Sequence, residues 1–132
     1  MNAEPSTPLI SGVDFVSIPT HDLDAAIAFY GTTLGLRMSM HRPDLFAEFE
    51  PGDVTLSIMN AEKMGLEHHV SRNAFALHVD DVEAARATLE ARGVTFTSDT
   101  FDTGVCHVAF FADPDGNALM LHHRYAPRTP LA

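Results

Sequence analysis

Histidine is the residue type whose frequency in this chain first suggests chemistry. Eight histidines occur among 132 residues, and imidazole can bind metals or transfer protons near neutral pH. Two of them, His78 and His122, stand in apolar stretches that are typical of strands. We interpret this pair as candidate catalytic groups, acting as a general base or as polar anchors in a pocket. The alternative is that each lies at a frayed strand end without a chemical role.

The other histidines and the cysteine give weaker signals. His21 is predicted in a strand-to-helix loop, where it could line the mouth of a pocket, although loop histidines are usually surface residues. Residues 67–69, with the sequence EHH, fall in a polar connection and are expected to be solvated. His107 has no evident partner. Cys106 cannot form an intrachain disulfide because it is the only cysteine, and it is expected in the core.

Composition and charge restrict the class of partner. The hydrophobic fraction of 45% is enough for a core, and the length suits one domain. A formal net charge of −10 opposes a nucleic-acid backbone, so no nucleic acid is expected as partner. No apolar run approaches the roughly 18 residues that span a bilayer, and residues 1–11 lack the features of a signal peptide. The expected location is therefore the cytoplasm, with no membrane partner.

An internal repeat organises most of the chain. Residues 18–36 resemble residues 77–94, with Asp22 matching Asp81 and Leu23 matching Val82. Such self-similarity indicates two copies of one supersecondary unit. Each copy has a strand, a helix and three further strands, which the residue patterns place at 13–18, 23–34, 36–40, 45–50 and 54–60 and at 74–79, 82–92, 94–98, 106–112 and 117–123.

Local signals bound the two predicted helices. Asp22 or Asp24 can cap the first helix, and Asp80 followed by Glu83 fits a capping box for the second. Glycines follow both helices, at residues 35 and 93, and are expected in the left-handed conformation that ends a helix.

Alternation of side chains divides the first and last strands of each copy into two faces. One face is uniformly apolar and is predicted to pack on the helices: Val16, Ile18, Leu56, Ile58, Phe75, Leu77, Val79, Leu119 and Leu121. The other is mixed and suits a cavity for an organic ligand, although it also fits an ordinary half-exposed sheet. The predicted ligand-binding residues on this face are Phe15, Ser17, Thr55, Ser57, Met59, Ala74, Ala76, His78, Met120 and His122.

Three segments resemble a known family. Residues 21–36 (HDLDAAIAFYGTTLGL), 79–94 (VDDVEAARATLEARGV) and 110–121 (FFADPDGNALML) are similar to signatures of the vicinal oxygen chelate superfamily of glyoxalases, ring-cleaving dioxygenases and bleomycin resistance proteins. The resemblance implies an α+β fold of two βαβββ modules, whose curved mixed sheets form a cup with helices outside. It places one domain at 12–124, with modules at 12–60 and 73–124, a connector at 61–72, an N-terminal lead at 1–11 and a C-terminal tail at 125–132.

The resemblance also implies a homodimer and, in the family's enzymes, one divalent metal bound in the cup. The four ligand positions of the family fall on Phe15, Ser57, Ala74 and Met120. Phenylalanine and alanine have no donor, a serine hydroxyl is a poor one, and a thioether suits soft Cu(I). We therefore predict no metal at these positions and no other cofactor.

Three functions remain open at this point. The first is a metal-free protein that binds an organic ligand in the cup, as bleomycin resistance proteins do. The second is a lyase, isomerase or dioxygenase of the same superfamily, using a displaced metal site built from His21, His78 or His122, or using histidine acid–base chemistry. The third is a structural or regulatory module that uses the sheet for protein contacts.

Overall fold

The computed structural model describes residues 8–129, so residues 1–7 of the predicted lead and 130–132 of the predicted tail lie outside the described residues. Each half of the chain supplies one strand, one helix and three strands, which confirms the predicted α+β class. The first half contains β1 (Phe15–Pro19), α1 (Leu23–Ile27) continuing as the π-helix η1 (Ala28–Thr33), β2 (Arg37–Arg42), β3 (Phe46–Glu50) and β4 (Thr55–Met59). The 3-10 helix η2 (Glu62–Met64) then leads to β5 (Phe75–His78), α2 (Val82–Ala91), β6 (Phe101–Asp102), β7 (Cys106–Ala112) and β8 (Ala118–Arg124).

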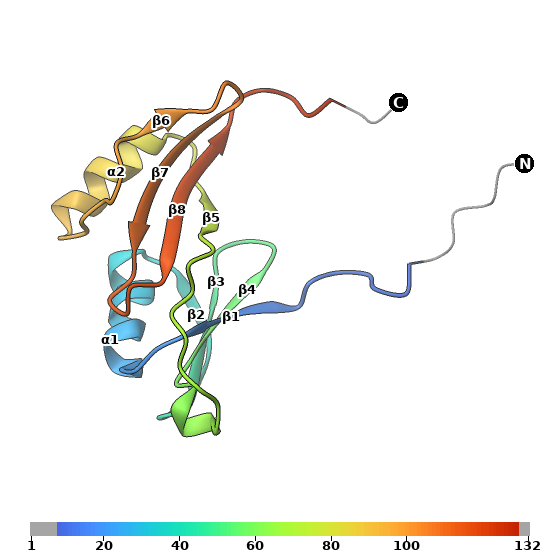
Figure 1. Ribbon diagram of the computed structural model, residues 1–132, viewed down its shortest axis with the longest axis vertical. Helices are drawn as coiled ribbons and strands as arrows, with labels where there is room; N and C mark the ends of the chain where they lie inside the picture. The colour runs from blue at the N-terminus through green and yellow to red at the C-terminus, as the bar shows by residue number, and fades with distance from the viewer. Residues whose placement is uncertain (1–7, 130–132) are drawn as a thin grey trace, which may run out of the picture.

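The strands form two mixed sheets of the same topology. Their orders are β1-β4-β3-β2 and β5-β8-β7-β6. The first strand of each module pairs in parallel with the last, and the remaining pairs are antiparallel. Both helices cover the same side of the two sheets, so that the opposite side carries no helix (Figure 1). This is the predicted arrangement of two βαβββ modules with helices outside.

The core lies between the helices and the sheets. All nine residues predicted to pack on the helices belong to it or pack against it, and Ile18, Ile58 and Leu119 are fully buried. Strand β3 adds Ala47 and Phe49, also fully buried. Alternation along the strands therefore identified the helix-facing side correctly.

Aspartates begin both helices. The Asp22 carboxylate accepts a hydrogen bond from the Ala25 amide at 3.1 Å, and Asp81 accepts one from Ala84 at 3.0 Å. The prediction of Asp80 as the second cap was wrong by one residue, because Asp81 has the extended backbone of an N-cap. The predicted positive φ is confirmed at Gly35 (76°) and Gly93 (94°).

The predicted strand at 94–98 was wrong. This segment makes only one isolated bridge, from Phe96 to Phe111, and the short edge strand β6 follows instead. Arg86 draws the segment toward α2, since its guanidinium donates to the Ser98 carbonyl at 2.8 Å and lies over the Phe96 ring. The Ser98 hydroxyl accepts a hydrogen bond from the Phe110 amide, which takes the place of a backbone hydrogen bond between two strands. Side-chain contacts of this kind compete with sheet pairing.

A carboxylate at the β7–β8 turn joins the two modules. The Tyr30 hydroxyl, from the first module, donates to Asp113 at 2.7 Å, and both residues are buried. The Asn117 amide donates to the same carboxylate and to the Pro19 carbonyl, each at 2.8 Å. The backbone amides of Asp115 and Asn117 donate to the second Asp113 oxygen at 2.9 Å. A buried carboxylate needs such a complete set of donors to remain charged.

The same turn holds the entrance of α1. Asp115 accepts from the Thr20 hydroxyl at 2.6 Å and from the His21 amide at 2.9 Å.

Burial, with the adjacent Asp113 charge, raises the pKa of the Tyr30 phenol far above its ordinary value, so Tyr30 acts only as a neutral donor to Asp113. The two modules are thus joined by polar contacts as well as by apolar packing.

No helix among residues 8–129 is long and apolar enough to cross a membrane.

Replacing Gly35 or Gly93 with alanine should lower the free energy of unfolding by about 1 kcal/mol, because a residue with a Cβ is strained at positive φ. The added Cβ meets no atom within 4 Å at either position, so the backbone alone is responsible. Gly52→Ala is the matched control, since its Cβ also enters open space without a positive φ. Urea denaturation measures all three; equal effects at Gly52 and Gly93 would contradict the explanation.

Tyr30→Phe should lower the free energy of unfolding by about 2 kcal/mol, because a buried hydrogen bond to a charged group is lost. Tyr125→Phe is the control, since Tyr125 donates a similar 2.8 Å bond to Asp102 at an exposed position. Its effect in the same thermal or urea melt should be much smaller. Equal losses for the two variants would mean that the buried Asp113 network does not hold the modules together.

Candidate functional site

The sheet side without helices carries the predicted cup residues. In the first module, Ser17 lies opposite Ser57, which lies opposite Glu48, which in turn lies opposite Met40. Residues directly opposite one another share a face, so these four form a row across the sheet. Ser57 is only 8% exposed, whereas Phe15 at the edge is 55% exposed. We call the helix-free face of each sheet a half-cup. The floor of the first half-cup is therefore polar at its centre.

Strand β3 contributes two carboxylates that were missing from the sequence prediction. Glu48 and Glu50 both point to the cup side, because the intervening Phe49 is buried against the helices. Glu50 accepts hydrogen bonds from Ser39 and Thr55, each at 2.6 Å, and these bonds lower its pKa. The alternation FAEFE in the sequence places both glutamates on one face of a strand. The prediction of cup residues, however, covered only the first and last strands of each repeat.

The second module presents a different surface. Ala76 lies opposite Met120, which lies opposite Phe110, and the Phe110 ring stacks on Phe101 with centroids 5.9 Å apart. All four side chains are apolar, and each is at least partly exposed. The surface of this half of the cup is therefore aromatic and thioether in character. Phe101 and Phe110 lie outside the first and last strands of the repeat, to which the prediction of cup residues was confined.

His78 and His122 lie directly opposite each other in the parallel pair of β5 and β8. Partial burial, and then the neighbouring His78, lower the pKa of His122 and favour its neutral form. His78 is largely exposed and has its Nε2 3.3 Å from Asp80. The pair is positioned at the end of the second half-cup rather than over its centre.

Tertiary structure gives three further histidines, His21, His68 and His107, neighbours that the sequence did not reveal. His21 stacks on His68 with centroids 3.5 Å apart and has its Nδ1 2.8 Å from Glu62. The prediction that His68 is solvated was therefore wrong: both of its ring nitrogens are buried without a hydrogen-bond partner among the described residues. His107 lies 3.6 Å from Asp102 and beside the Tyr125 ring.

The four positions at which the family resemblance implies metal ligands do not fit a divalent ion. Phe15 and Ser57 occupy neighbouring strands of the first sheet, Met120 lies on β8 of the second, and Ala74 directly precedes β5. Together they offer one hydroxyl and one thioether, which is not a donor set for Mg²⁺, Mn²⁺, Fe²⁺ or Zn²⁺. Among residues 8–129, no group of three His, Cys, Asp or Glu side chains could hold a metal ion, so His21, His78 and His122 form no displaced site there.

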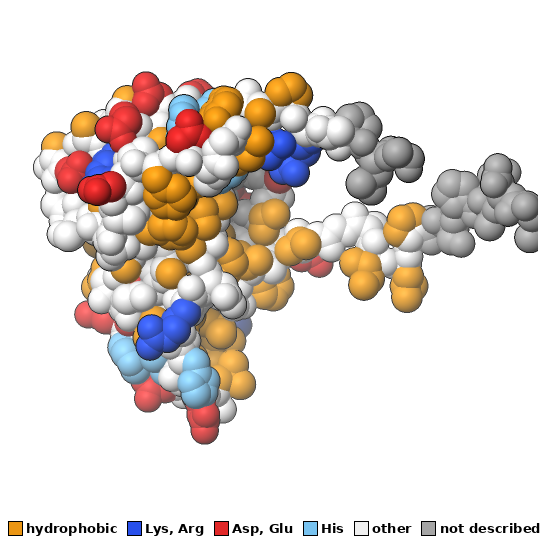
Figure 2. Space-filling view, turned by 45° about the horizontal axis from the view of Figure 1, so that its top comes forward, with side chains coloured by type: hydrophobic (Ala, Val, Ile, Leu, Met, Phe, Trp, Pro, Cys, Tyr) orange, Lys and Arg blue, Asp and Glu red, His pale blue; other side chains and the backbone are white. Residues whose placement is uncertain are grey.

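The concave side is open within one chain. Hydrophobic side chains gather on the side of the body from which the N-terminal arm projects, away from the helices (Figure 2). A cavity of about 600 Å³ follows the seam between the modules, but of the predicted cup residues it includes only Ala76 and His78. The other lining residues come from β1 and the segment before it, from β5, and from the β3–β4 turn and start of β4: Val13, Val16, Pro51, Gly52, Asp53, Val54, Leu56, Phe75 and Leu77.

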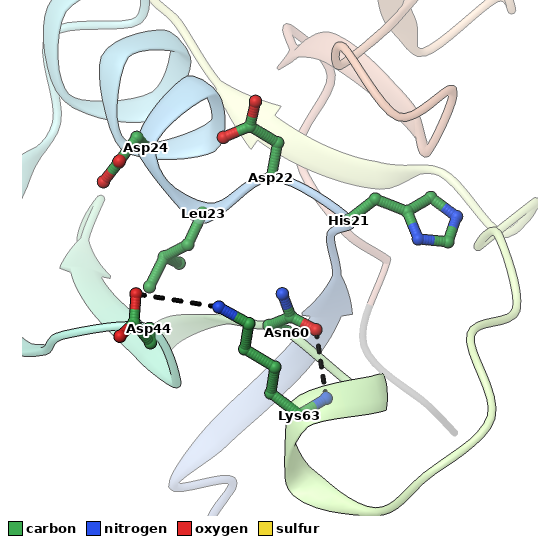
Figure 3. Close-up of a pocket in the computed structure, with 7 residues that line it drawn as sticks. All are labelled: His21, Asp22, Leu23, Asp24, Asp44, Asn60 and Lys63. Carbon is green, nitrogen blue, oxygen red and sulfur yellow. Dashed lines mark hydrogen bonds and ion pairs between the residues drawn. The ribbon is translucent and has the colours of Figure 1, made fainter.

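A separate hollow of about 200 Å³ lies beside the start of α1 (Figure 3). Asp22, Asp24 and Asp44 border it, and Lys63 lies 3.7 Å from Asp44. His21 points away from the other labelled side chains (Figure 3). The hollow is mainly polar and lies outside the cup, so it is not the organic-ligand site that the strand pattern predicted.

Known proteins share this arrangement. Residues 12–121 match the model of the Glyoxalase/Bleomycin resistance protein/Dioxygenase superfamily. A lactoylglutathione lyase from Haemophilus influenzae is 31% identical over 107 residues, covering 72% of this chain and 79% of that protein. TnmS3, an antibiotic binding protein from Streptomyces sp. CB03234, is 27% identical with a TM-score of 0.76 over 89% of this chain and 99% of its own.

A lactoylglutathione lyase from Agrobacterium tumefaciens supports the fold alone. It is 22% identical, with a TM-score of 0.74 over 87% of this chain and 95% of its own. The family match covers most of the chain, and the repeated βαβββ architecture agrees with it. The chain therefore belongs to the Glyoxalase/Bleomycin resistance protein/Dioxygenase superfamily.

Proposed function

We propose that this protein binds a small organic ligand in its cup without using the family's metal site. The observation that carries the proposal is the identity of the four matched positions, Phe15, Ser57, Ala74 and Met120, whose side chains suit contact with an organic molecule better than metal coordination. Phe101 and Phe110 enlarge the same apolar surface. The likeness to an antibiotic binding protein is consistent with this function.

A second candidate is an enzyme of the same superfamily that uses histidine acid–base chemistry. The observation in its favour is the opposed pair His78 and His122, together with the lowered pKa of His122. A neutral imidazole is the form that accepts a proton, so His122 would be the base. The similarity to lactoylglutathione lyases also belongs to this candidate. His78 and His122 lie at the rim of the second half-cup, whereas the apolar side chains at its centre favour the binding function over the enzymatic one.

A homodimer completes the proposal. Each chain leaves its two half-cups open, with Phe15 55%, Met40 52% and Phe101 42% exposed. Exposed apolar surface on a sheet is commonly covered by another chain. A second copy would place the half-cups of two chains face to face and enclose the ligand between them.

Met120→Glu should weaken binding of the neutral aromatic probe 1-naphthylmethanol about tenfold, because it places a charge on the apolar floor of the cup. The control is Met64→Glu, on the exposed η2 outside the cup. Isothermal titration calorimetry measures both, and EDTA should change neither the affinity nor the melting temperature, because the proposed state contains no metal to remove. Loss of binding after EDTA treatment, restored by Zn²⁺ or Mn²⁺, would contradict the metal-free site.

Light scattering coupled to size exclusion should give a mass of twice the 14.4 kDa of one chain at micromolar concentration. Introducing a charge at an exposed apolar position of the open face, as in Phe15→Glu, should shift the mass toward the monomer. Leu66→Glu, an equally exposed apolar residue in the connector, is the control and should leave the mass unchanged. A wild-type mass that stays at one chain would rule out the dimer.

A further inference from the structure

The carboxylate of Glu48 occupies the centre of the first half-cup. It projects from the middle of β3, on the side away from the helices, with Ser57 opposite it on β4 and Met40 opposite it on β2. The residue is half-buried rather than on the outer rim. A carboxylate that faces the open side of the sheet can pair with a cation from the protein or from a ligand.

The described residues provide that partner for Glu50 but not for Glu48. Glu50 accepts two side-chain hydrogen bonds and has Arg37 opposite it. In the part of the chain that the structure describes, the one side-chain hydrogen bond that involves Glu48 goes to its backbone, where the carbonyl accepts from the Ser39 hydroxyl at 3.4 Å. Among residues 8–129, no cation lies within ion-pair distance of the Glu48 carboxylate, and Arg42 lies opposite Phe46 instead.

Ser57 adds a second polar group on the same side of the sheet. The side chain is only 8% exposed, yet its hydroxyl makes no hydrogen bond to another described residue. Leu56 and Ile58 on either side face the helices, so this hydroxyl faces the cup. Ser17 lies beside it on β1. The Ser57 oxygen is not one of the fully buried unpaired atoms among residues 8–129, so it remains accessible to a partner on the cup side.

We propose, building on the function given above, that Glu48 and Ser57 bind the cationic head of the organic ligand, a primary ammonium or guanidinium group. Such a group donates several hydrogen bonds, and those to a carboxylate are the strong, charge-assisted kind. The apolar body of the ligand would then lie on the aromatic surface of Phe101, Phe110 and Met120. The net charge of −10 attracts cations to the protein and disfavours anionic ligands.

Three probes of one shape and different charge test this assignment. Calorimetry should show that 1-naphthylmethylammonium binds about tenfold more tightly than 1-naphthylmethanol, and that 1-naphthoate binds most weakly. Glu48→Gln should abolish the advantage of the cation while leaving the affinity for 1-naphthylmethanol unchanged. Glu90→Gln removes the same charge from an exposed ion pair on α2, outside the cup, and should preserve the advantage. The comparison of probes on the unmodified protein needs no variant, so a folding defect in one variant does not affect it.

The outcomes separate this inference from the function on which it rests. If 1-naphthylmethanol binds in a Met120-dependent way but the cation gains nothing, the cationic head group is wrong and the cup still binds ligands. If the preference for the cation survives Glu48→Gln or disappears in Glu90→Gln, it reflects the overall charge rather than Glu48. If none of the three probes binds, both the inference and the proposed function fail.

Discussion

The buried carboxylate of Asp113 is the constraint on which the arrangement of the two modules depends. Each module has its own sheet and helix, and the apolar core between them specifies proximity but no unique orientation. Asp113 restricts the orientation of one module relative to the other, because it accepts hydrogen bonds from Tyr30 of the first module and from three donors of its own turn. Asn117 extends the network to the Pro19 carbonyl at the end of β1. The positions of the two half-cups follow from this junction.

The half-cups are alike in backbone and different in chemistry. The first has hydroxyls and carboxylates at its centre, from Ser17, Ser57 and Glu48, whereas the second has Phe101, Phe110 and Met120. The repeated unit therefore has a polar floor in the first module and an apolar floor in the second. Such a pair of surfaces suits a ligand with one charged end and one hydrophobic end. Polar side chains can replace the water around the charged end, and apolar side chains can cover the hydrophobic end.

Particular residues show how far sequence reasoning reached. The repeat, the alternating strands and the glycines at 35 and 93 predicted the modules and the helix-facing side, because these features depend on contacts within a few residues. The strand at 94–98 was wrong because Arg86 and Ser98 form contacts that alternation cannot reveal. Glu48 was missed because the prediction of cup residues covered only the first and last strands of each repeat, and its neighbours on β2 and β4 follow from strand pairing.

The sequence by itself determined the fold class, the family and the absence of metal-binding side chains at the four matched positions. Those conclusions need only residue types and spacing, which the chain carries locally. Tertiary structure alone decided that Tyr30 pairs with Asp113, that His21 stacks on His68 and that Glu48, without an ion-pair partner among residues 8–129, lies opposite Ser57. Burial and pairing are properties of neighbours far apart in the chain, and only the folded molecule brings those neighbours together.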